Sequence, residues 1–150
     1  FLGTVYSKVN FPNKADSILC YSPVEPMNYS LTTFAGQTAD SLYYPEALNT
    51  KDKYTYYTGQ NDPLLTIRSE AAGSSNTLLE GRKLLIVKDS YAHSFVPFAA
   101  NHFSEIYMAD LRYYNQPLSS LIEEKGITDI LVLYNTENFA TDTSIAKLVR

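Results

Sequence analysis

Three short apolar runs in the second half of the chain constrain its fold more than any other feature. They lie within KLLIVK, EIYMAD and DILVLY, which span residues 83–88, 105–110 and 129–134. Continuous apolar runs of this length are typical of strands in a parallel sheet that is covered on both faces. A helical pattern follows each run, over residues 92–102, 117–126 and 144–149. The repeated order of strand and helix predicts an α/β fold, with a parallel sheet and helices on both faces.

The helical patterns carry start and stop signals and one irregularity. Pro117 lies near the start of the second pattern and Gly126 lies just past its end, which is where helix termini favour these two residues. Pro97 falls inside the first pattern, where a proline removes a backbone hydrogen bond. The first helix is therefore predicted with an internal difficulty at that position.

The first part of the chain, residues 1–75, reads as an extended, β-rich region. Apolar and polar residues alternate over 27–33, and LLTIRS (64–69) and SILCY (17–21) also resemble strands. The stretch AAGSSNT (71–77) separates this region from the α/β region of residues 82–150. We therefore predict one domain over 1–150 with two subregions. The opening FLGTVYSKV has no Met and no signal-peptide pattern, so we expect an N-terminally truncated piece of a longer protein.

Charge and cysteine content exclude some classes of function. The formal net charge of −4 argues against a nucleic-acid partner, because such proteins need basic surface to neutralise phosphates. No run of about eighteen apolar residues exists, so no membrane-spanning segment is predicted. The single cysteine, Cys20, excludes an internal disulfide and a cysteine-cluster metal site. Its place in SILCY favours a small buried hydrophobic side chain.

Polar residues follow each of the three predicted strands. They are Asp89 and Ser90 after the first strand, Asp110 and Arg112 after the second, and Asn135 after the third. In open α/β sheets, ligands bind beyond the carboxyl ends of the strands, so these side chains should converge on one edge.

Ser90 has two interpretations. As a helix N-cap, its hydroxyl would stabilise the following helix by about 1 kcal/mol. As a nucleophile, it would face the crevice, with backbone N–H groups available to an oxyanion. His93 lies three residues later and would share a helical face with Ser90, but a supporting or surface role is favoured over catalysis. For His102, near the predicted helix end, a structural role is favoured.

Two further segments leave alternatives open. Gly59 and Asn61 in YYTGQNDPL either present an amide side chain to a site or form an ordinary turn. Arg112, Tyr113 and Tyr114 either bind an anion or a sugar, or simply pack.

The run LLIVKDSYAHSFVPFAANHFSEIYMADLRYYN resembles the DHHW protein family of bacteria, as do FLGTVYSK and KYTYYTGQNDPLLTI. That family is in turn similar to the alginate O-acetyltransferases, whose fold is SGNH hydrolase-like, or flavodoxin-like. The resemblance implies that Ser90 is the nucleophile, with Asn135 and the backbone amide of Tyr91 as oxyanion donors. It gives Asp89 and Arg112 supporting roles.

The sequence also departs from the family's pattern. Lys88 replaces the usual glycine before Asp-Ser, and no glycine occurs in DLRYYN. The chain contains no Trp, so it does not contain the Asp-His-His-Trp motif. The resemblance implies that the catalytic acid and histidine lie upstream of FLGT, so we expect this chain to be inactive alone.

The resemblance implies O-acetyl transfer or ester hydrolysis on a cell-surface polysaccharide or other glycan, at an extracytoplasmic location. It implies no metal and no organic cofactor, and it suggests a membrane acyl-transfer partner. The alternative is a non-catalytic glycan-binding or assembly module of the cell envelope.

Overall fold

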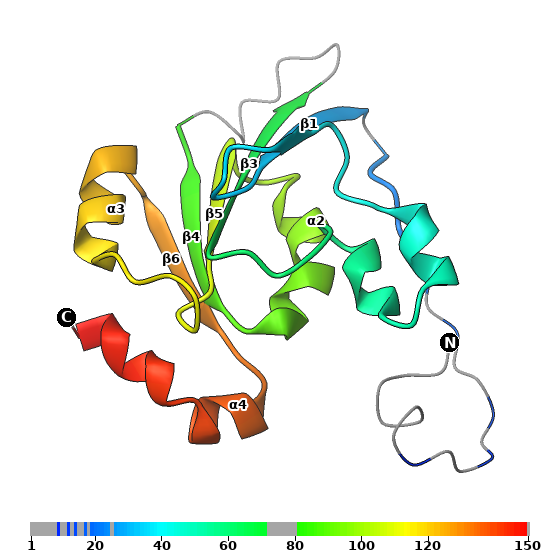
Figure 1. Cartoon of the computed structure of the whole chain (residues 1–150). Helices are drawn as coiled ribbons and strands as arrows, with labels where there is room; N and C mark the ends of the chain where they lie inside the picture. Colours follow the sequence, from blue (N-terminus) through cyan, green and yellow to red (C-terminus); the bar gives the residue numbers. More distant parts are fainter. Residues whose placement is uncertain are drawn as a thin grey trace.

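The computed structural model describes residues 26–71 and 81–149, together with residues 19–24 and the single residues Val9, Pro12, Lys14 and Ser17. A six-stranded sheet with the order β2-β1-β3-β5-β4-β6 runs through the centre of this part (Figure 1). The strands are β1 (Met27–Thr32), β2 (Thr38–Ala39), β3 (Leu64–Ala71), β4 (Lys83–Lys88), β5 (Glu105–Ala109) and β6 (Asp129–Leu133).

The three strands predicted in the second half are all present and parallel. The central strand β4 pairs in parallel with β5 and with β6, so that Leu85 lies between Tyr107 and Ile130. The prediction of an α/β arrangement over residues 82–150 is therefore confirmed in its strands and their direction.

The sheet as a whole is mixed, so the prediction of a parallel sheet is wrong beyond these three strands. β3 pairs antiparallel with both β1 and β5, and β1 pairs antiparallel with β2. Only five residues, 33–37, link β1 to β2. A parallel neighbour needs a crossover of about a dozen residues or more, so this short link permits antiparallel pairing alone. The β-rich region therefore continues the same sheet.

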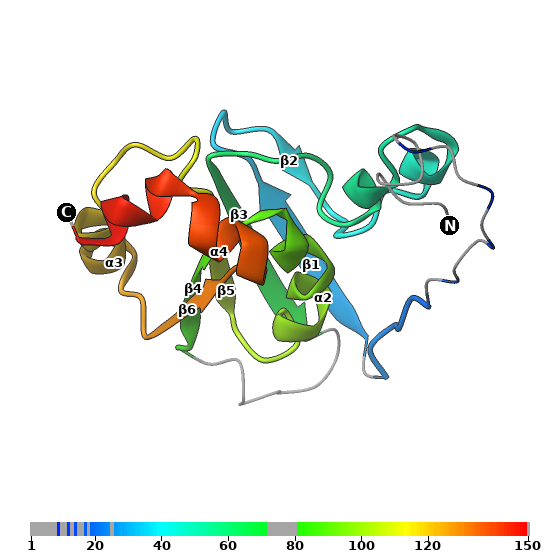
Figure 2. The same ribbon diagram turned by 90° about the horizontal axis from the view of Figure 1, so that it is seen from below.

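Helical segments cover both faces of the parallel strands (Figures 1 and 2). One face of β4 carries Leu84 and Ile86 against η4 (Ser90–Ser94) and α2 (Val96–Ala99). The other face carries Leu85 and Val87, which pack with α3 (Leu118–Lys125) and with Leu148 of η5 (Thr143–Val149). Burial on both faces explains why this strand is apolar at consecutive positions, since each such side chain contributes about 1.5–3 kcal/mol.

Pro97 divides the first predicted helix. Residues 90–94 form the 3₁₀ helix η4, and α2 begins at Val96 with the proline in its first turn. A proline is tolerated there because the first N–H groups of a helix have no partner within that helix. One continuous helix over 92–102 was therefore the wrong prediction.

The second and third helical patterns match the structure more closely. Pro117 is the N-cap of α3, and Gly126 ends it with a left-handed φ of 62°. The last pattern forms η5 as a 3₁₀ helix. A short helix that was not predicted, α4 (Thr136–Thr141), precedes it.

The prediction of extended structure holds for only part of the first half. The alternating segment forms β1 and LLTIRS lies in β3, but η1 (Pro45–Asn49) and η2 (Lys53–Tyr56) are 3₁₀ helices. In SILCY, the described residues do not form a strand, and Cys20 is exposed. The predicted buried position of Cys20 is therefore wrong. Apart from Ala71, which ends β3, the predicted boundary loop lies within residues 72–80, outside the described part.

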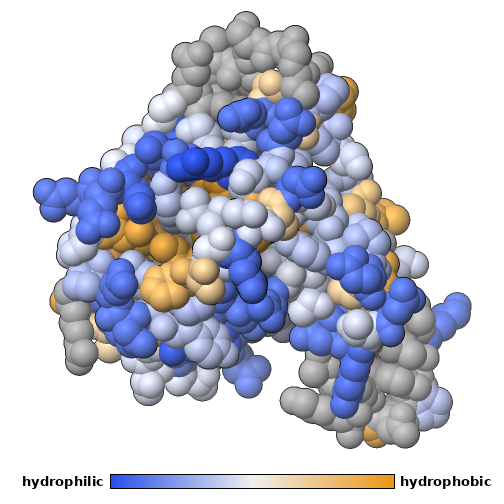
Figure 3. Space-filling view, turned by 45° about the horizontal axis from the view of Figure 1, so that its top comes forward, coloured by the Kyte–Doolittle hydropathy of each residue, from blue (hydrophilic) through white to orange (hydrophobic). Residues whose placement is uncertain are grey.

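The surface in Figure 3 is mostly hydrophilic, with hydrophobic side chains gathered in small patches. The larger patch lies on the left of that view, which is the side of α3. On this side the edge strand β6 exposes Ile130 and Val132. No helix among the described residues is long and apolar enough to cross a membrane.

Candidate active site

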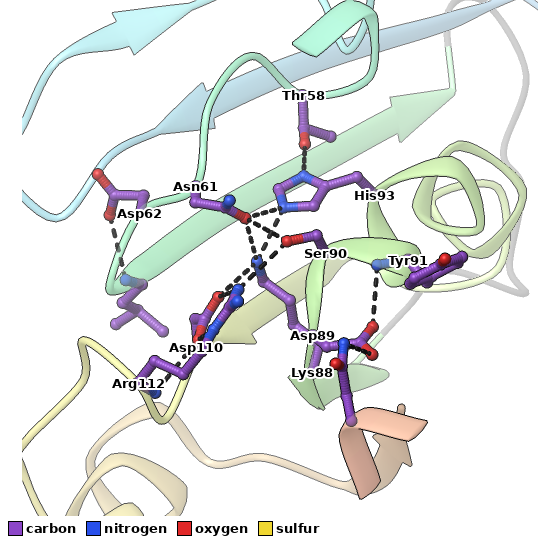
Figure 4. A network of polar contacts seen from close by, with 12 residues as sticks. Thr58, Asn61, Asp62, Lys88, Asp89, Ser90, Tyr91, His93, Asp110 and Arg112 are labelled. Carbon is purple, nitrogen blue, oxygen red and sulfur yellow. Dashed lines mark hydrogen bonds and ion pairs between the residues drawn. The ribbon is translucent and has the colours of Figure 1, made fainter. Parts of the chain in front are cut away.

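The predicted site residues meet where several strands reach one edge of the sheet (Figure 4). β4 and β5 end at this edge because they are parallel. β3 begins there because it is antiparallel to β5, with Leu64 opposite Ala109. Asn61, which lies just before β3, is thereby brought close to the residues that follow β4 and β5.

Asp89 organises the turn that follows β4. Its Oδ1 accepts a hydrogen bond from the Tyr91 backbone amide at 2.9 Å, which makes Asp89 the N-cap of η4. Its Oδ2 accepts from the Asn135 backbone amide and from Asn138 Nδ2, both at 2.8 Å. The side chain is almost fully buried. Asp89 thus ties the start of η4 to the start of α4, and Ser90 is not the helix cap.

Ser90 is the first residue of η4, and its hydroxyl lies at the centre of the site. The Ser90 Oγ–H donates to Asn61 Oδ1 at 3.2 Å, and Ser90 Oγ accepts a hydrogen bond from Arg112 Nη2 at 3.2 Å. The turn around Asn61 therefore presents its amide side chain to Ser90. Arg112 places a positive charge directly beside the serine oxygen.

Lys88 lies beneath this surface and is fully buried. Its Nζ donates to Asn61 Oδ1 at 3.3 Å, to Asp110 Oδ2 at 3.2 Å and to His93 Nε2 at 2.8 Å. Burial lowers the pKa of Lys88, although the carboxylate of Asp110 opposes the shift. Because the lysine nitrogen donates, Asn61 must turn its oxygen toward it, which directs the Asn61 NH₂ group away from the lysine.

Asp110 is the shared anion of Lys88 and Arg112. Arg112 donates from Nε to Oδ1 at 2.9 Å and from Nη2 to Oδ2 at 2.6 Å, a bidentate pair. Burial alone raises the pKa of Asp110, but the hydrogen bonds and charges of its two partners outweigh burial and lower it. The hydrogen bond to Asp110 is the main reason that the pKa of Arg112 is raised. Asp110 therefore holds the guanidinium group in position at Ser90.

His93 supports this network from the interior. Only 3% of it is exposed, and burial, followed by the charge of Lys88, lowers the pKa of His93 to about 3. His93 Nε2 lies 2.8 Å from Lys88 Nζ and 3.1 Å from Asn61 Oδ1. With Lys88 as an ammonium ion, Nε2 accepts from the lysine, so Nδ1–H donates to Thr58 Oγ1. His93 makes no hydrogen bond with Ser90 among those of the described residues. It supports Lys88 and is too weak a base for catalysis near neutral pH.

Thr58 and Gly59 shape the turn that leads to Asn61. Both have positive φ angles, 54° for Thr58 and 79° for Gly59. The glycine adopts this conformation easily, but it is unusual for a β-branched residue. Thr58 is held there by its contact with His93 and by a 2.7 Å hydrogen bond from its backbone amide to the Leu42 carbonyl. Gly59 does not contact Ser90, so its role is in the backbone of the turn.

Two expected oxyanion donors are engaged elsewhere. The Asn135 side chain caps α4 by accepting from the Asn138 backbone amide at 2.7 Å. The Tyr91 amide donates to Asp89. Neither group hydrogen-bonds to Ser90 among the described residues, and their assignment as oxyanion donors stays a prediction.

The aromatic residues after Arg112 differ in environment. Tyr114 is buried against the α3 face of the sheet, so packing explains it. Tyr113 is half exposed, and its ring lies 5.4 Å from the guanidinium carbon of Arg112. Of this pair, Tyr113 alone remains available to a ligand.

Sequence reasoning missed the roles of Lys88 and Thr58. The available signal was a lysine directly continuing a buried apolar strand, since a charge at that point needs a partner when it is buried. Among the described residues, no three His, Cys, Asp or Glu side chains come together as potential metal ligands.

Together, these features define a mixed α/β protein with a serine hydroxyl at the carboxyl end of a central parallel strand, held between an arginine and an amide. No protein-family model matches the sequence, and no curated protein matches it. A DHHW family protein from Eubacterium siraeum has a similar structure, with a TM-score of 0.73 and 24% identity. The match covers 96% of this chain and 48% of that one, so the chain spans about half the length of its relative. The expected resemblance to the DHHW family is therefore supported, and the chain has the fold of a DHHW family protein.

Bacillus cereus PatB1 is also similar in structure. It matches with a TM-score of 0.58 and 23% identity, over 78% of this chain and 38% of PatB1. A structure of PatB1 with a sulfonyl adduct matches with a TM-score of 0.57 and 24% identity, over the same shares of the two chains. These similarities concern the fold.

Proposed function

We propose that this protein belongs to an SGNH hydrolase-like, flavodoxin-like fold and acts in O-acyl transfer or ester hydrolysis on a cell-surface glycan. Ser90 is the nucleophile. The observation that carries the proposal is the contact of the Ser90 hydroxyl with both Arg112 and Asn61 at the end of β4. The likeness to PatB1 adds support, because a sulfonyl adduct forms when a nucleophilic atom attacks an electrophilic sulfur.

The chemistry proceeds in two steps through an acyl-enzyme. Ser90 Oγ attacks the acyl carbonyl as its proton passes to a base, and the tetrahedral oxyanion then expels the donor's leaving group. A glycan hydroxyl or water takes the acyl group from Ser90 in the second step. Transfer and hydrolysis therefore share the first step and differ only in the acceptor.

Arg112 and Asn61 replace Asn135 and Tyr91 as the proposed oxyanion donors. The guanidinium group is fixed by Asp110 and already touches Ser90 Oγ. Asn61 Oδ1 faces both Lys88 and Ser90, and the NH₂ group of Asn61 has no hydrogen-bond partner among the described residues. This NH₂ group is proposed to donate to the oxygen of the acyl carbonyl rather than to Ser90 Oγ. Donors that are positioned before reaction stabilise developing negative charge without reorganisation.

The general base is proposed to be a histidine outside the described residues, oriented by an acid, as the DHHW resemblance implies. His93 does not fill this role, because it is neutral, buried and bonded to Lys88. The acid next to the serine, Asp89, already accepts three hydrogen bonds. We further propose an extracytoplasmic location, with a polysaccharide as acceptor and a membrane acyl-transfer protein as partner.

The test is to trap the acyl group on Ser90. The chain is incubated with an aryl acetate and added imidazole, which supplies a base, and peptide mass spectrometry locates the acetyl group. Wild type is expected to be acetylated at Ser90, and Arg112→Gln to react about 10²–10³ times more slowly. Ser94→Ala, one turn along the same helix, is the matched control and should react like wild type. Acetylation spread over other residues, with none at Ser90, would remove it from the mechanism.

The second candidate is a non-catalytic glycan-binding or assembly module of the cell envelope. It is favoured by the absence, among the described residues, of any basic group that accepts the Ser90 proton. Tyr91, which is 58% exposed, and the half-exposed Tyr113 flank the site with aromatic surface that suits a sugar. This candidate predicts glycan binding that is unchanged in Ser90→Ala and no acetylation of Ser90 under any condition.

A further inference from the structure

A hollow lies beside the Ser90 network and is separate from it. Its volume is about 490 Å³, and it is bounded by β1, β2, the start of β3 and the η1–η2 pair. The size falls within the range of small-molecule sites. Its base contains Leu31 and Leu65, which also belong to the hydrophobic core, so the hollow rests on packed and fixed structure.

The lining surface is mostly apolar, and the polar groups on it include no cation. It contains one carboxylate, Glu46, two amides, Gln37 and Gln60, the ring of Tyr44 and several threonine hydroxyls, but no Lys or Arg. Among the described residues, the side chains of Glu46, Gln37 and Gln60 have no hydrogen-bond or ion-pair partner. These groups therefore remain available to a ligand.

This chemistry selects a neutral, hydroxyl-rich ligand. A lone carboxylate without a cation repels phosphates and carboxylates, while carboxylate and amide oxygens accept hydrogen bonds from hydroxyl groups. The amide NH₂ groups donate to ring and hydroxyl oxygens, and an aromatic ring covers an apolar C–H face. A sugar ring presents all of these features together.

The hollow shares a wall with the catalytic site. Thr58, Gly59 and Gln60 line it, and the next residue, Asn61, accepts a hydrogen bond from the Ser90 hydroxyl. The unusual φ of 54° at Thr58 lies in this wall. Backbone strain of this kind persists where the surrounding structure holds it, and it concentrates at ligand sites.

We propose that this hollow binds one sugar unit of a neutral glycan, next to Ser90 across the turn of residues 58–61. The proposal that a sugar binds rests on the lining and does not depend on the proposed function. Its assignment as a unit of the acylated substrate rests on the proposed function. A ligand that packs against Thr58 and Gln60 also holds the Asn61 amide in place at the serine.

The test uses the full chain and three neutral probes, cellobiose, maltose and N,N′-diacetylchitobiose, with glucose 6-phosphate as an anionic comparison. Saturation-transfer NMR and calorimetry measure binding. At least one neutral probe is expected to bind, and glucose 6-phosphate to bind more weakly than that probe. Glu46→Ala and Gln60→Ala should each weaken the neutral probe by about tenfold, the effect of losing one hydrogen bond in a site.

The matched control is Glu70→Ala, which removes an exposed glutamate from β3 outside the hollow. It should bind the probe like wild type, as should Ser90→Ala. Each neutral probe is tested up to about 50 mM, which is about 50 times a Kd of 1 mM. If none binds at that concentration, or if all variants bind equally well, the proposal is overturned. If a sugar binds but Ser90 is not acetylated, the sugar site is retained and the proposed catalysis is rejected. If Ser90 is acetylated but no sugar binds, the proposed catalysis is retained and the sugar site is rejected.

Discussion

The buried position of His93 predicts a specific loss of stability in mild acid. Burial, together with the charge of Lys88, lowers the pKa of His93 to about 3, whereas an unfolded chain has a histidine pKa of about 6.5. As the pH falls below about 6.5, the unfolded chain takes up a proton that the folded chain does not. The free energy of unfolding therefore falls with pH, and the fall continues until the pH reaches about 3.

The magnitude follows from the difference between the two pKa values. With one proton taken up only by the unfolded chain, the free energy of unfolding falls by about 2 kcal/mol between pH 7 and pH 5. The limit of this fall, below pH 3, is about 5 kcal/mol. Besides Lys88, the charged groups that act on His93 are Asp110, Arg112 and Asp89. The pKa of Asp110 is lowered, so the stability it contributes is present above about pH 4 and is lost only below that. The window from pH 7 to 5 therefore isolates the histidine.

The assay is urea unfolding of wild type, His93→Gln and His102→Gln at pH 7, 6 and 5. Between pH 7 and 5, the free energy of unfolding of wild type should fall by about 2 kcal/mol more than that of His93→Gln. His102→Gln, which removes an exposed histidine, should retain the full loss. NMR titration of wild type gives an independent check, in which the His93 ring signals should not shift between pH 7 and 4.5. Equal pH slopes for wild type and His93→Gln, or a ring that titrates near pH 6.5, would refute the reasoning.

Three further predictions concern Asp89, the buried ion pair and the cysteine. Asp89→Ala should lower the free energy of unfolding by about 3 kcal/mol, because it removes a buried carboxylate that accepts three hydrogen bonds; Asp40→Ala, at an exposed aspartate, should change it by at most about 0.5 kcal/mol. Asp110→Ala should lower the free energy of unfolding by about 3–5 kcal/mol in the same chemical unfolding assay, since it leaves two cations without their anion. Lys88→Met should lower it by less, since the carboxylate keeps its arginine partner. Cys20 should react with Ellman's reagent in the folded protein as fast as in urea, because it is exposed; protection in the folded state would contradict its observed position.

The sequence predicted the second half of the sheet well, because its strands are buried on both faces. Such strands are apolar at every position, and this pattern is visible without knowing the neighbours. It does not show how these strands pair with the first half of the chain, which depends on links and partners elsewhere. The antiparallel pairing of β3 with β5, which joins the two halves into one sheet, therefore could not be predicted. The 3₁₀ helices η1 and η2 of the first half were not predicted for a similar reason, since local periodicity is weak there.

The site shows the same division between local pattern and tertiary contact. Sequence position placed Ser90 and Arg112 at one sheet edge, and the two do meet there. It also placed Asn135 at that edge, but the direction of the side chain is set by its role as the cap of α4. Asn61 reaches Ser90 from a different strand, and its amide is oriented by Lys88, a charge that ends an otherwise apolar strand. A lysine at a strand end normally extends into water, and here it is buried because Asp110, Asn61 and His93 accept its hydrogen bonds. Since those three partners come from separate segments of the chain, the side chains around Ser90 are held by tertiary contacts that no single segment of the sequence encodes.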